Sequence, residues 1–291
     1  MPDRRKVGLA ILLMVGATLC FAALDATSKY LSRTYPIPMM VWGRYTFHCL
    51  MMLIFLAPSM RLELVATTRP VAQITRALML TGTTGFSMAG FSLMPLAEST
   101  AFLFVTPLVV VILSHWLLKE SITRGHWIAV LAGFGGALLI ARPGGALNAE
   151  GIVWMTLAAA CYAIYQIQTR QLSPTENTLT MLFYTALVGT VAMTLAAPLY
   201  WGGPTPGWLD AALIASLGIY GGTGHLMLTR AFRYAAASFL SPFLYGQLIW
   251  AGLLGWMFYD HLPDLLSIAG MVVIAGSSLS IALGERLRRR A

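Results

Sequence analysis

The sequence has 291 residues, of which 58% are hydrophobic and only 10% are charged, and its mean hydropathy is +0.73. Soluble domains carry about 25% charged residues, so this composition excludes a soluble protein and indicates a chain that lies in a lipid bilayer. The formal net charge of +8 does not indicate nucleic-acid binding, because basic residues in an apolar chain are typical of cytoplasmic loops.

Ten apolar segments follow one another along the chain, each near the length of about 20 residues that crosses the hydrocarbon core. The first follows the basic stretch Arg4-Arg5-Lys6, as in a signal peptide, but it continues into further apolar sequence and is interpreted as a transmembrane helix. Loops of only a few residues require neighbouring helices to pack antiparallel. The predicted spans are 7–30, 37–57, 71–94, 97–118, 125–141, 151–170, 177–199, 209–229, 236–258 and 265–284.

The two halves of the chain repeat each other. The stretch Cys20–Ser32 recurs at Cys161–Ser173, at an offset of 141 residues. Five spans in each half mean that the second half crosses the membrane in the opposite direction, the inverted repeat found in many transporters. The sequence therefore predicts an all-α integral membrane fold of ten transmembrane helices. Two inverted five-helix repeats, residues 1–145 and 146–291, surround a central cavity in this prediction.

The distribution of Lys and Arg predicts the orientation. With the N-terminus in the cytoplasm, 15 basic residues fall on the cytoplasmic side, Arg76 among them, and 4 fall outside, Arg44 among them. The prediction is a multi-pass protein of the bacterial inner membrane with both termini cytoplasmic. Ten spans suffice to enclose a cavity, so membrane lipid and a small-molecule substrate are the expected partners of a functional monomer.

Arg44 and His48 are four residues apart in the second span. Arg44 suits a carboxylate ligand. It lies beside Trp42 and Tyr45, however, and this composition is typical of the aromatic belt at the membrane surface. The favoured interpretation is that Arg44 anchors the helix at the interface.

Two stretches carry a resemblance to a known family. In the first half Ser99–Pro107 leads to Leu117–Ser121, and in the second half Ala235–Pro242 leads to Gly255–Pro263. With the two five-span halves, they resemble the EamA-type family of the drug/metabolite transporter superfamily, although Asp260-His261 stands where the family ending has Gly-Glu. The resemblance implies a bundle whose cavity is lined by the first, third, fourth, sixth, eighth and ninth helices. It also implies export or exchange of small metabolites, and the family includes exporters of amino acids, aromatic ones among them.

The sixth span carries the clearest candidate site. Tyr162, Tyr165, Gln166 and Thr169 recur at helical spacing and therefore share one face. Hydroxyl and amide groups among rings suit a cavity that stacks an aromatic group and hydrogen-bonds a polar one. The alternative is hydrogen bonding between helices. Tyr162, Tyr165 and Gln166 are predicted to line the substrate cavity.

Asp25 and Lys29 form a charged pair four residues apart near the end of the first span. Charges inside a membrane indicate function, and this pair suits the ammonium and carboxylate of a zwitterion. The alternative is a salt bridge that closes an outer gate or fixes a helix end. Asp25, with Phe21 one turn earlier, is predicted to line the cavity, and Lys29 to act in gating.

The eighth and ninth spans contribute further candidates. His225 follows Gly221-Gly222-Thr223-Gly224, and such glycines permit either local unwinding or close helix packing. His225, Tyr245 and Trp250 are predicted to line the cavity.

Pro107 and Pro242 occupy matching places in the two halves, early in the fourth and ninth spans. Each removes one backbone hydrogen bond and bends its helix. They are predicted to be a pair of hinges for alternating access. Ordinary proline usage in membrane helices is the alternative.

Motifs of enzymes are absent from the sequence. It contains no GxxxxGK[ST] loop, no GxSxG elbow and no HExxH pair. The prediction is a secondary transporter with no catalytic residue, cofactor, metal site or nucleic-acid partner. It exports or exchanges small metabolites across the inner membrane by alternating access, with amino acids that have aromatic or apolar side chains as the first candidates. The alternatives are a carrier of a nucleoside, S-adenosylmethionine or a hydrophobic drug and, disfavoured, a channel or an integral-membrane enzyme.

Overall fold

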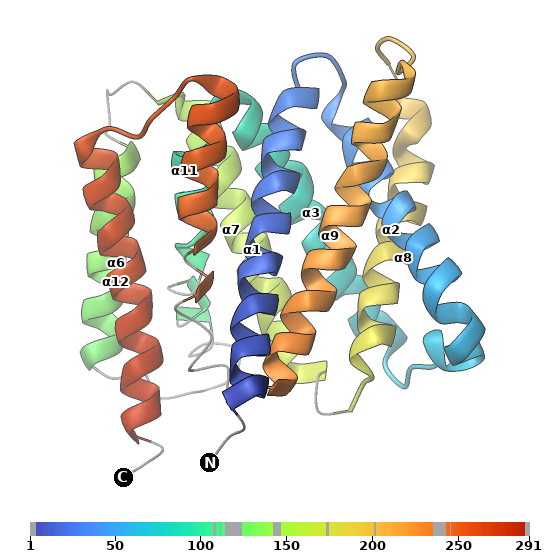
Figure 1. Cartoon of the computed structure of the whole chain (residues 1–291), viewed down its shortest axis with the longest axis horizontal. Coiled ribbons are helices and arrows are strands. Elements are labelled where there is room, and N and C mark those ends of the chain that lie inside the picture. The colour runs from blue at the N-terminus through green and yellow to red at the C-terminus, as the bar shows by residue number, and fades with distance from the viewer. Residues whose placement is uncertain are drawn as a thin grey trace.

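The structure is a computed structural model that describes residues 4–106, 109–110, 112–113, 124–141, 147–172, 175–200, 202–234, 243–244 and 246–288. Long helices run up and down side by side in one bundle (Figure 1). They are α1 (Arg4–Leu31), α2 (Ile37–Met60), α3 (Pro70–Leu93), α4 (Leu96–Leu103), α6 (Arg124–Ala141), α7 (Ala149–Leu172), α8 (Thr178–Tyr200), α9 (Trp208–Tyr234), α11 (Gly246–Tyr259) and α12 (Leu265–Arg288), with a short 3₁₀ helix η1 (Arg61–Leu64) after α2.

These helices confirm the predicted all-α membrane fold. Within the described ranges, four segments are by themselves long and apolar enough to cross a membrane: Gly8–Leu31, Ile37–Leu64, Thr178–Leu199 and Trp208–Leu228. α1 begins and α12 ends at the same end of the bundle (Figure 1), as an even number of crossings requires. We call this end the terminal end, and the end where α1 stops the far end.

Prolines define where several helices start. α2 follows Pro36, α3 has Pro70 at its first position and α4 follows Pro95. Proline suits the first turn of a helix because the amide hydrogen that it lacks has no partner there. The same residues that break the apolar pattern in the sequence therefore set the helix boundaries.

α4 covers the first part of the predicted span 97–118, and residues 109–110 and 112–113 farther along the span are also helical. α4 ends at Leu103, and the backbone amides of Phe104 and Val105 bond three residues back, to Ala101 and Phe102. The sequence has a proline at position 107, and proline lacks the amide hydrogen that a continuing helix would use. In the ninth predicted span α11 begins at Gly246, and residues 243–244 before it are also helical. Pro107, Pro242 and Tyr245 lie outside the described residues.

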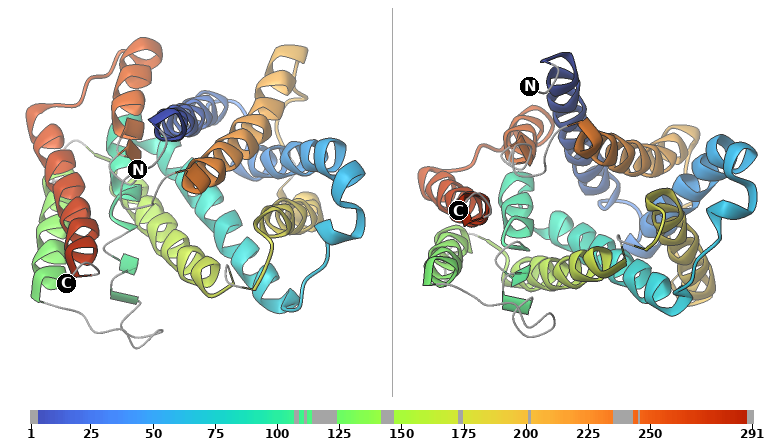
Figure 2. Two further views of the ribbon diagram at one scale, coloured as in Figure 1. Left: turned by 60° about the horizontal axis from the view of Figure 1, so that its bottom comes forward. Right: turned by 90° about the horizontal axis from the view of Figure 1, so that it is seen from below.

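The two halves pack with twofold-related pairing. α1 packs along α9, and its counterpart in the second half, α7, packs along α3. Figure 2 shows these pairs on opposite sides of the bundle. α2 pairs with α8, α4 with α11 and α6 with α12, so these three helices of the first half each contact their own counterpart. This pairing is what two inverted repeats produce.

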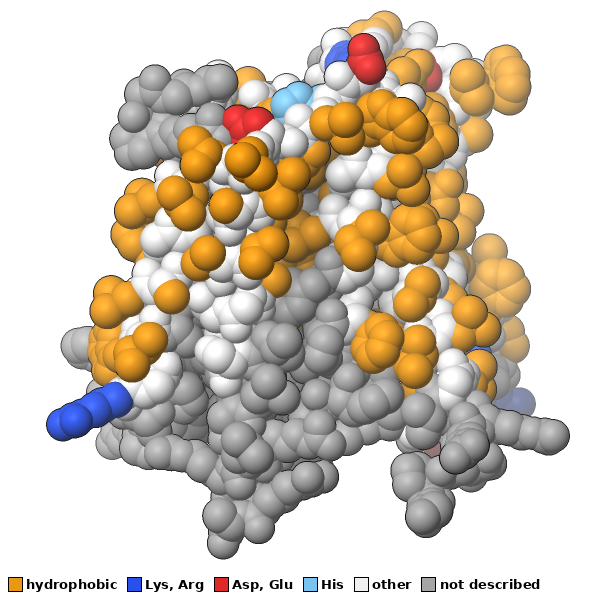
Figure 3. Space-filling view, turned by 60° about the vertical axis from the view of Figure 1, so that its left-hand side comes forward, with side chains coloured by type: hydrophobic (Ala, Val, Ile, Leu, Met, Phe, Trp, Pro, Cys, Tyr) orange, Lys and Arg blue, Asp and Glu red, His pale blue; other side chains and the backbone are white. Residues whose placement is uncertain are grey.

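α6 and α12 form a close pair at one edge of the bundle. A Cβ on Gly136 would lie 2.8 Å from the carbonyl oxygen of Gly270, and one on Gly270 would lie 2.6 Å from that of Gly136. Glycines let the two backbones touch, as is common between membrane helices. The outward face of the pair is apolar and suits lipid; its exposed large side chains include Trp127, Ile128, Leu131, Phe134, Leu265 and Val272. On the face drawn in Figure 3, hydrophobic side chains spread between charged groups near the two ends.

Hydrogen bonds from loop residues join the two repeats at each end of the bundle. At the far end the hydroxyl of Tyr35 donates to Oδ2 of Asp210 over 2.6 Å. At the terminal end Glu176, at the matching place in the second half, accepts hydrogen bonds from the hydroxyls of Thr67 (2.7 Å) and Thr68 (2.9 Å) and from the amide of Gln73 (3.2 Å). The pKa of Glu176 lies below its ordinary value. The hydrogen bond from the Thr67 hydroxyl lowers it most, and the other donors lower it further.

We expect the hydrogen bonds of Glu176 to make a pH-dependent contribution to the free energy of unfolding. A lowered pKa means that its contribution is complete above the ordinary value of about 4.3 and is lost as the pH falls through the lower folded-state pKa. Glu176→Gln should lower the Tm near neutral pH, and the difference from the wild type should shrink in acid. Thermal unfolding at two pH values measures this. Glu63→Gln, at an exposed side chain of the same end, is the control, and a difference that stays constant with pH would contradict the prediction.

Candidate functional site

A cavity of about 690 Å³ lies inside the bundle. Its walls come from the six helices implied by the sequence resemblance and also from α2 and α8, which contribute Arg44 and Thr178. The cavity extends to Thr178, the first residue of α8, whose side chain is exposed at the terminal end. Its size falls within the roughly 300–1,000 Å³ of sites that enclose drug-sized ligands.

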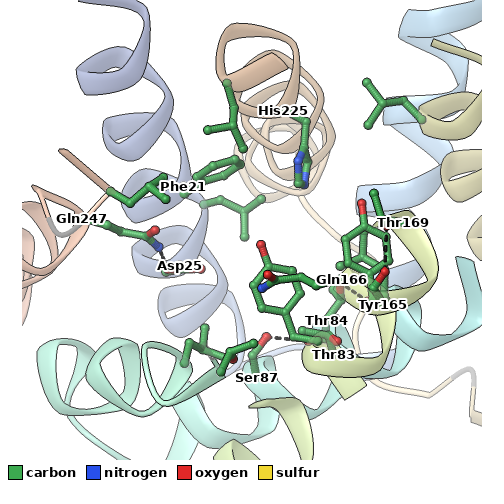
Figure 4. Close-up of a pocket in the computed structure, with 18 of the residues that line it drawn as sticks. Phe21, Asp25, Thr83, Thr84, Ser87, Tyr165, Gln166, Thr169, His225 and Gln247 are labelled. Carbon is green, nitrogen blue, oxygen red and sulfur yellow. Dashed lines mark hydrogen bonds between the residues drawn. The ribbon is translucent and has the colours of Figure 1, made fainter. Parts of the chain in front are cut away.

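The structure brings together most of the predicted cavity residues. Phe21, Asp25, Tyr162, Tyr165, Gln166 and His225 line the cavity. Figure 4 shows Asp25 on one wall and Tyr165 and Gln166 on the wall opposite. Trp250 is half-buried on α11 and is not part of the lining. Sequence reasoning could not place it, because a helix turned by a fraction of a revolution presents a different face.

The α7 wall is aromatic. The rings of Tyr162 and Tyr165 stack with centroids 5.7 Å apart and an interplanar angle of 11°. Across from them Phe21 meets His225 edge to face, with centroids 5.0 Å apart. Gln166 adds an amide next to the tyrosines (Figure 4). These groups offer flat apolar faces with hydrogen-bonding atoms at their edges.

Asp25 supplies a carboxylate to the wall formed by α1 and α11. Its side chain is only 7% exposed, and its Oδ2 accepts a hydrogen bond of 3.0 Å from the amide of Gln247. It does not pair with Lys29, so the salt bridge considered from the spacing of these two residues does not form. A buried carboxylate held by a neutral amide keeps free lone pairs for a ligand that donates hydrogen bonds.

Two arginines in the cavity were missed by the sequence interpretation. Arg76 was counted as a cytoplasmic charge, but it is 1% exposed and lines the cavity from α3. Arg44 was assigned to the membrane interface, but it lines the cavity from α2 and donates to the hydroxyl of Thr84 over 2.9 Å. The signal for Arg76 was the polar face that it shares with Thr83, Thr84 and Ser87 at helical spacing.

The glycines of α9 act in packing. α9 is continuous from Trp208 to Tyr234, so the alternative of local unwinding is not what this structure shows. A Cβ at Gly224 would lie 2.6 Å from the ring of Phe21, and one at Gly222 would lie 2.9 Å from the ring of His48. The glycines bring α9 against α1 and α2 and thereby set one side of the cavity.

The far end of the cavity is closed by contacts around α1. The ammonium of Lys29 donates to the carbonyls of Phe91 (2.7 Å) and Met94 (2.6 Å), at the end of α3. The hydroxyl of Tyr259 donates to the carbonyl of Ala26 over 2.6 Å, which joins α11 to α1. Lys29 and Tyr259 line a second pocket of about 310 Å³ at the far end, and neither is in the lining of the larger cavity.

A buried acid joins the repeats beside this closure. Glu98 in α4 is 3% exposed, and its Oε1 lies 3.3 Å from Nε2 of His261. Asp260 adopts a left-handed φ of 51°, which favours Gly but is tolerated by Asp. The departure from the Gly-Glu ending of the family pattern therefore preserves the turn and places an imidazole against Glu98.

In the described part of the chain, no group of three or more His, Cys, Asp or Glu side chains is placed to hold a metal ion. What the arrangement offers is reversible binding of an amphipathic molecule. Stacking, hydrogen bonding and charge are all present in one enclosed space.

Comparison with known proteins identifies relatives over nearly the whole chain. A family model described as the EamA-like transporter family matches residues 8–142 and 149–283. An S-adenosylmethionine uptake transporter of Rickettsia bellii is 28% identical over 91% of this chain and 90% of its own length. A pseudopaline exporter of Pseudomonas aeruginosa is 29% identical, covering 94% and 95%. A riboflavin transporter of Rhizobium johnstonii is 27% identical, covering 99% and 95%.

The fold also matches a solved protein. One crystal structure superposes with a TM-score of 0.66 at 19% sequence identity, covering 95% of this chain and 97% of that one. At this level of identity the likeness concerns the fold alone.

Proposed function

The chain belongs to the EamA-like transporter family of membrane-spanning small-molecule transporters, and we propose that it carries a zwitterionic metabolite by alternating access. Amino acids with aromatic or apolar side chains are the first candidates. The protein moves its substrate without catalysing a reaction. The observation that carries the proposal is the placement of Asp25 opposite the Tyr162–Tyr165 stack in one cavity.

Each end of such a substrate has a complementary group. The carboxylate of Asp25 suits an ammonium, since a buried charge in a membrane protein needs a partner. The tyrosine rings and Phe21 suit an aromatic or apolar side chain. Gln166 and the hydroxyls of α3 supply hydrogen bonds to the polar atoms between the two ends.

The proposal includes a direction and a setting. We place the protein in the bacterial inner membrane with cytoplasmic termini, as a functional monomer surrounded by lipid. The repeats 1–145 and 146–291 rock about the cavity, with Pro107 and Pro242 as hinges and Lys29 in the outer gate. The cavity then faces the cytoplasm in this structure, the state that loads a substrate for export.

S-adenosylmethionine is a second candidate. It combines the ammonium and carboxylate of an amino acid with a nucleoside ring system, so it fits the same groups. The volume of about 690 Å³ has room for a molecule larger than an amino acid. The Rickettsia relatives named as S-adenosylmethionine uptake transporters favour it as well.

Counterflow in proteoliposomes tests the proposal. Vesicles loaded with unlabelled phenylalanine, or with S-adenosylmethionine, should accumulate the labelled compound from outside, with or without a protonophore. Tyr165→Ala and Gln166→Ala should lower this uptake about tenfold, because they remove stacking or hydrogen-bonding groups worth roughly 1–1.5 kcal/mol.

Trp250→Ala is the matched control, because Trp250 is an aromatic residue on α11 outside the cavity lining. Its counterflow should equal that of the wild type. Equal losses in all three variants would contradict the assigned cavity. Counterflow of S-adenosylmethionine but not of phenylalanine would select the second candidate, and absence of both would reject the proposed substrates.

A further inference from the structure

The cavity contains a buried guanidinium that the protein itself does not fully satisfy. Arg76 donates from Nη1 to the hydroxyl of Thr169 (3.3 Å) and from Nη2 to the carbonyl of Met181 and the hydroxyl of Thr185 (2.8 Å). Its Nε–H has no hydrogen-bond partner among the described residues. A buried donor left without a partner is costly, and this one belongs to a side chain that lines the cavity.

No protein carboxylate balances the arginines at close range. In the described part of the chain, the one ion pair joins Glu98 to His261 at the far end. Neither Arg76 nor Arg44 therefore contacts a carboxylate of a described residue. Both guanidiniums line the same cavity. With two guanidiniums and one carboxylate, that of Asp25, in its described lining, this membrane-embedded space has an excess of positive groups that attracts an anion.

The surroundings of Arg76 hold its guanidinium in a fixed orientation. The Cζ atom lies 5.0 Å from the centroid of the Tyr165 ring, and the bonds to α7 and α8 fix the opposite edge. This guanidinium keeps its positive charge beside the cavity, and a charged hydrogen bond from a remaining N–H group suits a carboxylate. Arg44, which lies within electrostatic range of Asp25, adds positive charge between the two walls.

From these contacts we infer that Arg76, with Arg44 in support, forms an anion subsite that binds the carboxylate of the substrate. The inference rests on the proposed function and deepens it: the carried molecule has its carboxylate toward α3, α7 and α8 and its ammonium toward Asp25. A neutral or purely cationic molecule of the same shape brings no negative charge to the two guanidiniums that line the cavity and is bound more weakly. The carboxylate is thus the group by which the carrier selects its substrates.

Paired ligands that differ only in the carboxylate test the subsite. The pairs are phenylalanine and phenylalaninamide, S-adenosylmethionine and its decarboxylated form, and phenylacetate and phenylacetamide. Binding to the purified full-length protein is measured by competition and by thermal stabilisation. The wild type should bind the carboxylate member of a pair about 10- to 100-fold more tightly, the range for a charged hydrogen bond.

Arg76→Gln should bring the two members of a pair to equal affinity, whereas Arg44→Gln should reduce the preference less. Arg69→Gln, at an exposed arginine just before α3, is the matched control and should keep the wild-type preference. A role for Arg76 in helix packing alone predicts equal losses for both members of a pair. If Arg76→Gln does not fold, the affinities of the wild type and of Arg76→Lys for the two members of each pair still test the subsite.

Failure of the subsite and failure of the proposed substrate give different results. Equal wild-type binding of a carboxylate and its amide overturns the subsite and leaves the transporter proposal standing. Preference for phenylacetate or S-adenosylmethionine with no binding of phenylalanine supports the subsite and rejects the aromatic amino acids. No preference in any of the three pairs overturns the subsite.

Discussion

Gly218→Ala is expected to destabilise the protein strongly, because Gly218 lies where α9 crosses the backbone of α2. A Cβ there would lie 2.6 Å from the backbone nitrogen of His48 and 2.7 Å from the carbonyl oxygen of Arg44. Backbone atoms cannot rotate away, so the two helices must separate. Overpacking costs typically about 1–3 kcal/mol, and we expect the upper end of this range. For a chain of this size, that corresponds to a Tm lower by roughly 5 °C.

The same substitution at an open site is expected to have the opposite sign. Gly252 lies within α11, and a Cβ there would meet nothing within 4 Å. Gly252→Ala should leave the Tm unchanged or raise it, because alanine favours a helix by up to about 1 kcal/mol over glycine. Thermal unfolding of both variants, followed by size-exclusion chromatography, measures the contrast. A Gly218→Ala protein as stable as the wild type would show that α2 and α9 do not cross this closely.

The Gly218 crossing also matters for the cavity. Arg44 and His48 belong to the stretch of α2 that α9 contacts, and Arg44 lines the cavity. A wider crossing would therefore move a charged group of the site. Gly218→Ala is expected to lose transport along with stability.

The sequence was sufficient to predict the fold because its strongest signals are local. Apolar length, proline at helix starts and the repeat of Cys20–Ser32 at Cys161–Ser173 are all properties of short stretches. They predict ten helices and an inverted repeat without knowledge of any contact. The contacts of α2, α4 and α6 with their counterparts, and the matched pairs α1–α9 and α3–α7, then follow from the twofold relation.

The site was predictable only where one helix face carried it. Tyr162, Tyr165 and Gln166 share a face of α7, and all three line the cavity. Arg76 lies near the start of α3, where a charge has the same sequence signature whether it points to a loop or into the bundle. Its burial depends on how α7 and α8 pack around it. The polar face of α3 indicates on which side of the helix Arg76 lies, but it does not show that α7 and α8 enclose that side.

The pair Asp25 and Lys29 illustrates the same limit. Spacing four residues apart permits a salt bridge, but each side chain finds a different partner. Asp25 meets Gln247, 222 residues away in sequence, and Lys29 meets carbonyls of α3. Helix rotation decides between these outcomes, and the spacing of the two residues does not determine it.

Lys29→Met is expected to open the far end of the bundle. The Lys29 ammonium satisfies the carbonyls of Phe91 and Met94, where the helix dipole of α3 also favours a positive charge. Methionine keeps the length of the side chain but donates nothing. Each hydrogen bond to a charged group is worth about 1.5–3 kcal/mol, so losing one shifts a two-state equilibrium by about tenfold or more.

Cysteine accessibility in nanodiscs, where a reagent reaches both ends, measures this shift. Cys20, Cys49 and Cys161 are first replaced by serine, and one reporter is added at a time. Ala97→Cys reports on the far end, because Ala97 is 2% exposed in α4, and Thr178→Cys reports on the terminal mouth of the cavity. In the Lys29→Met protein, maleimide labelling should rise at the first reporter and fall at the second.

Arg33→Met is the matched control for the loss of charge. The Arg33 guanidinium is exposed and lies 5.2 Å from the centroid of the same Tyr259 ring that Lys29 contacts. An exposed cation–π contact contributes only about 0.5–1 kcal/mol, so labelling should change about fivefold at most. Lys29→Arg should restore much of the closure, because it restores donors. A folded Lys29→Met protein with unchanged labelling at both reporters would exclude Lys29 from the gate, and the Tyr259 bond to Ala26 and the Glu98–His261 pair would then have to hold the far end shut.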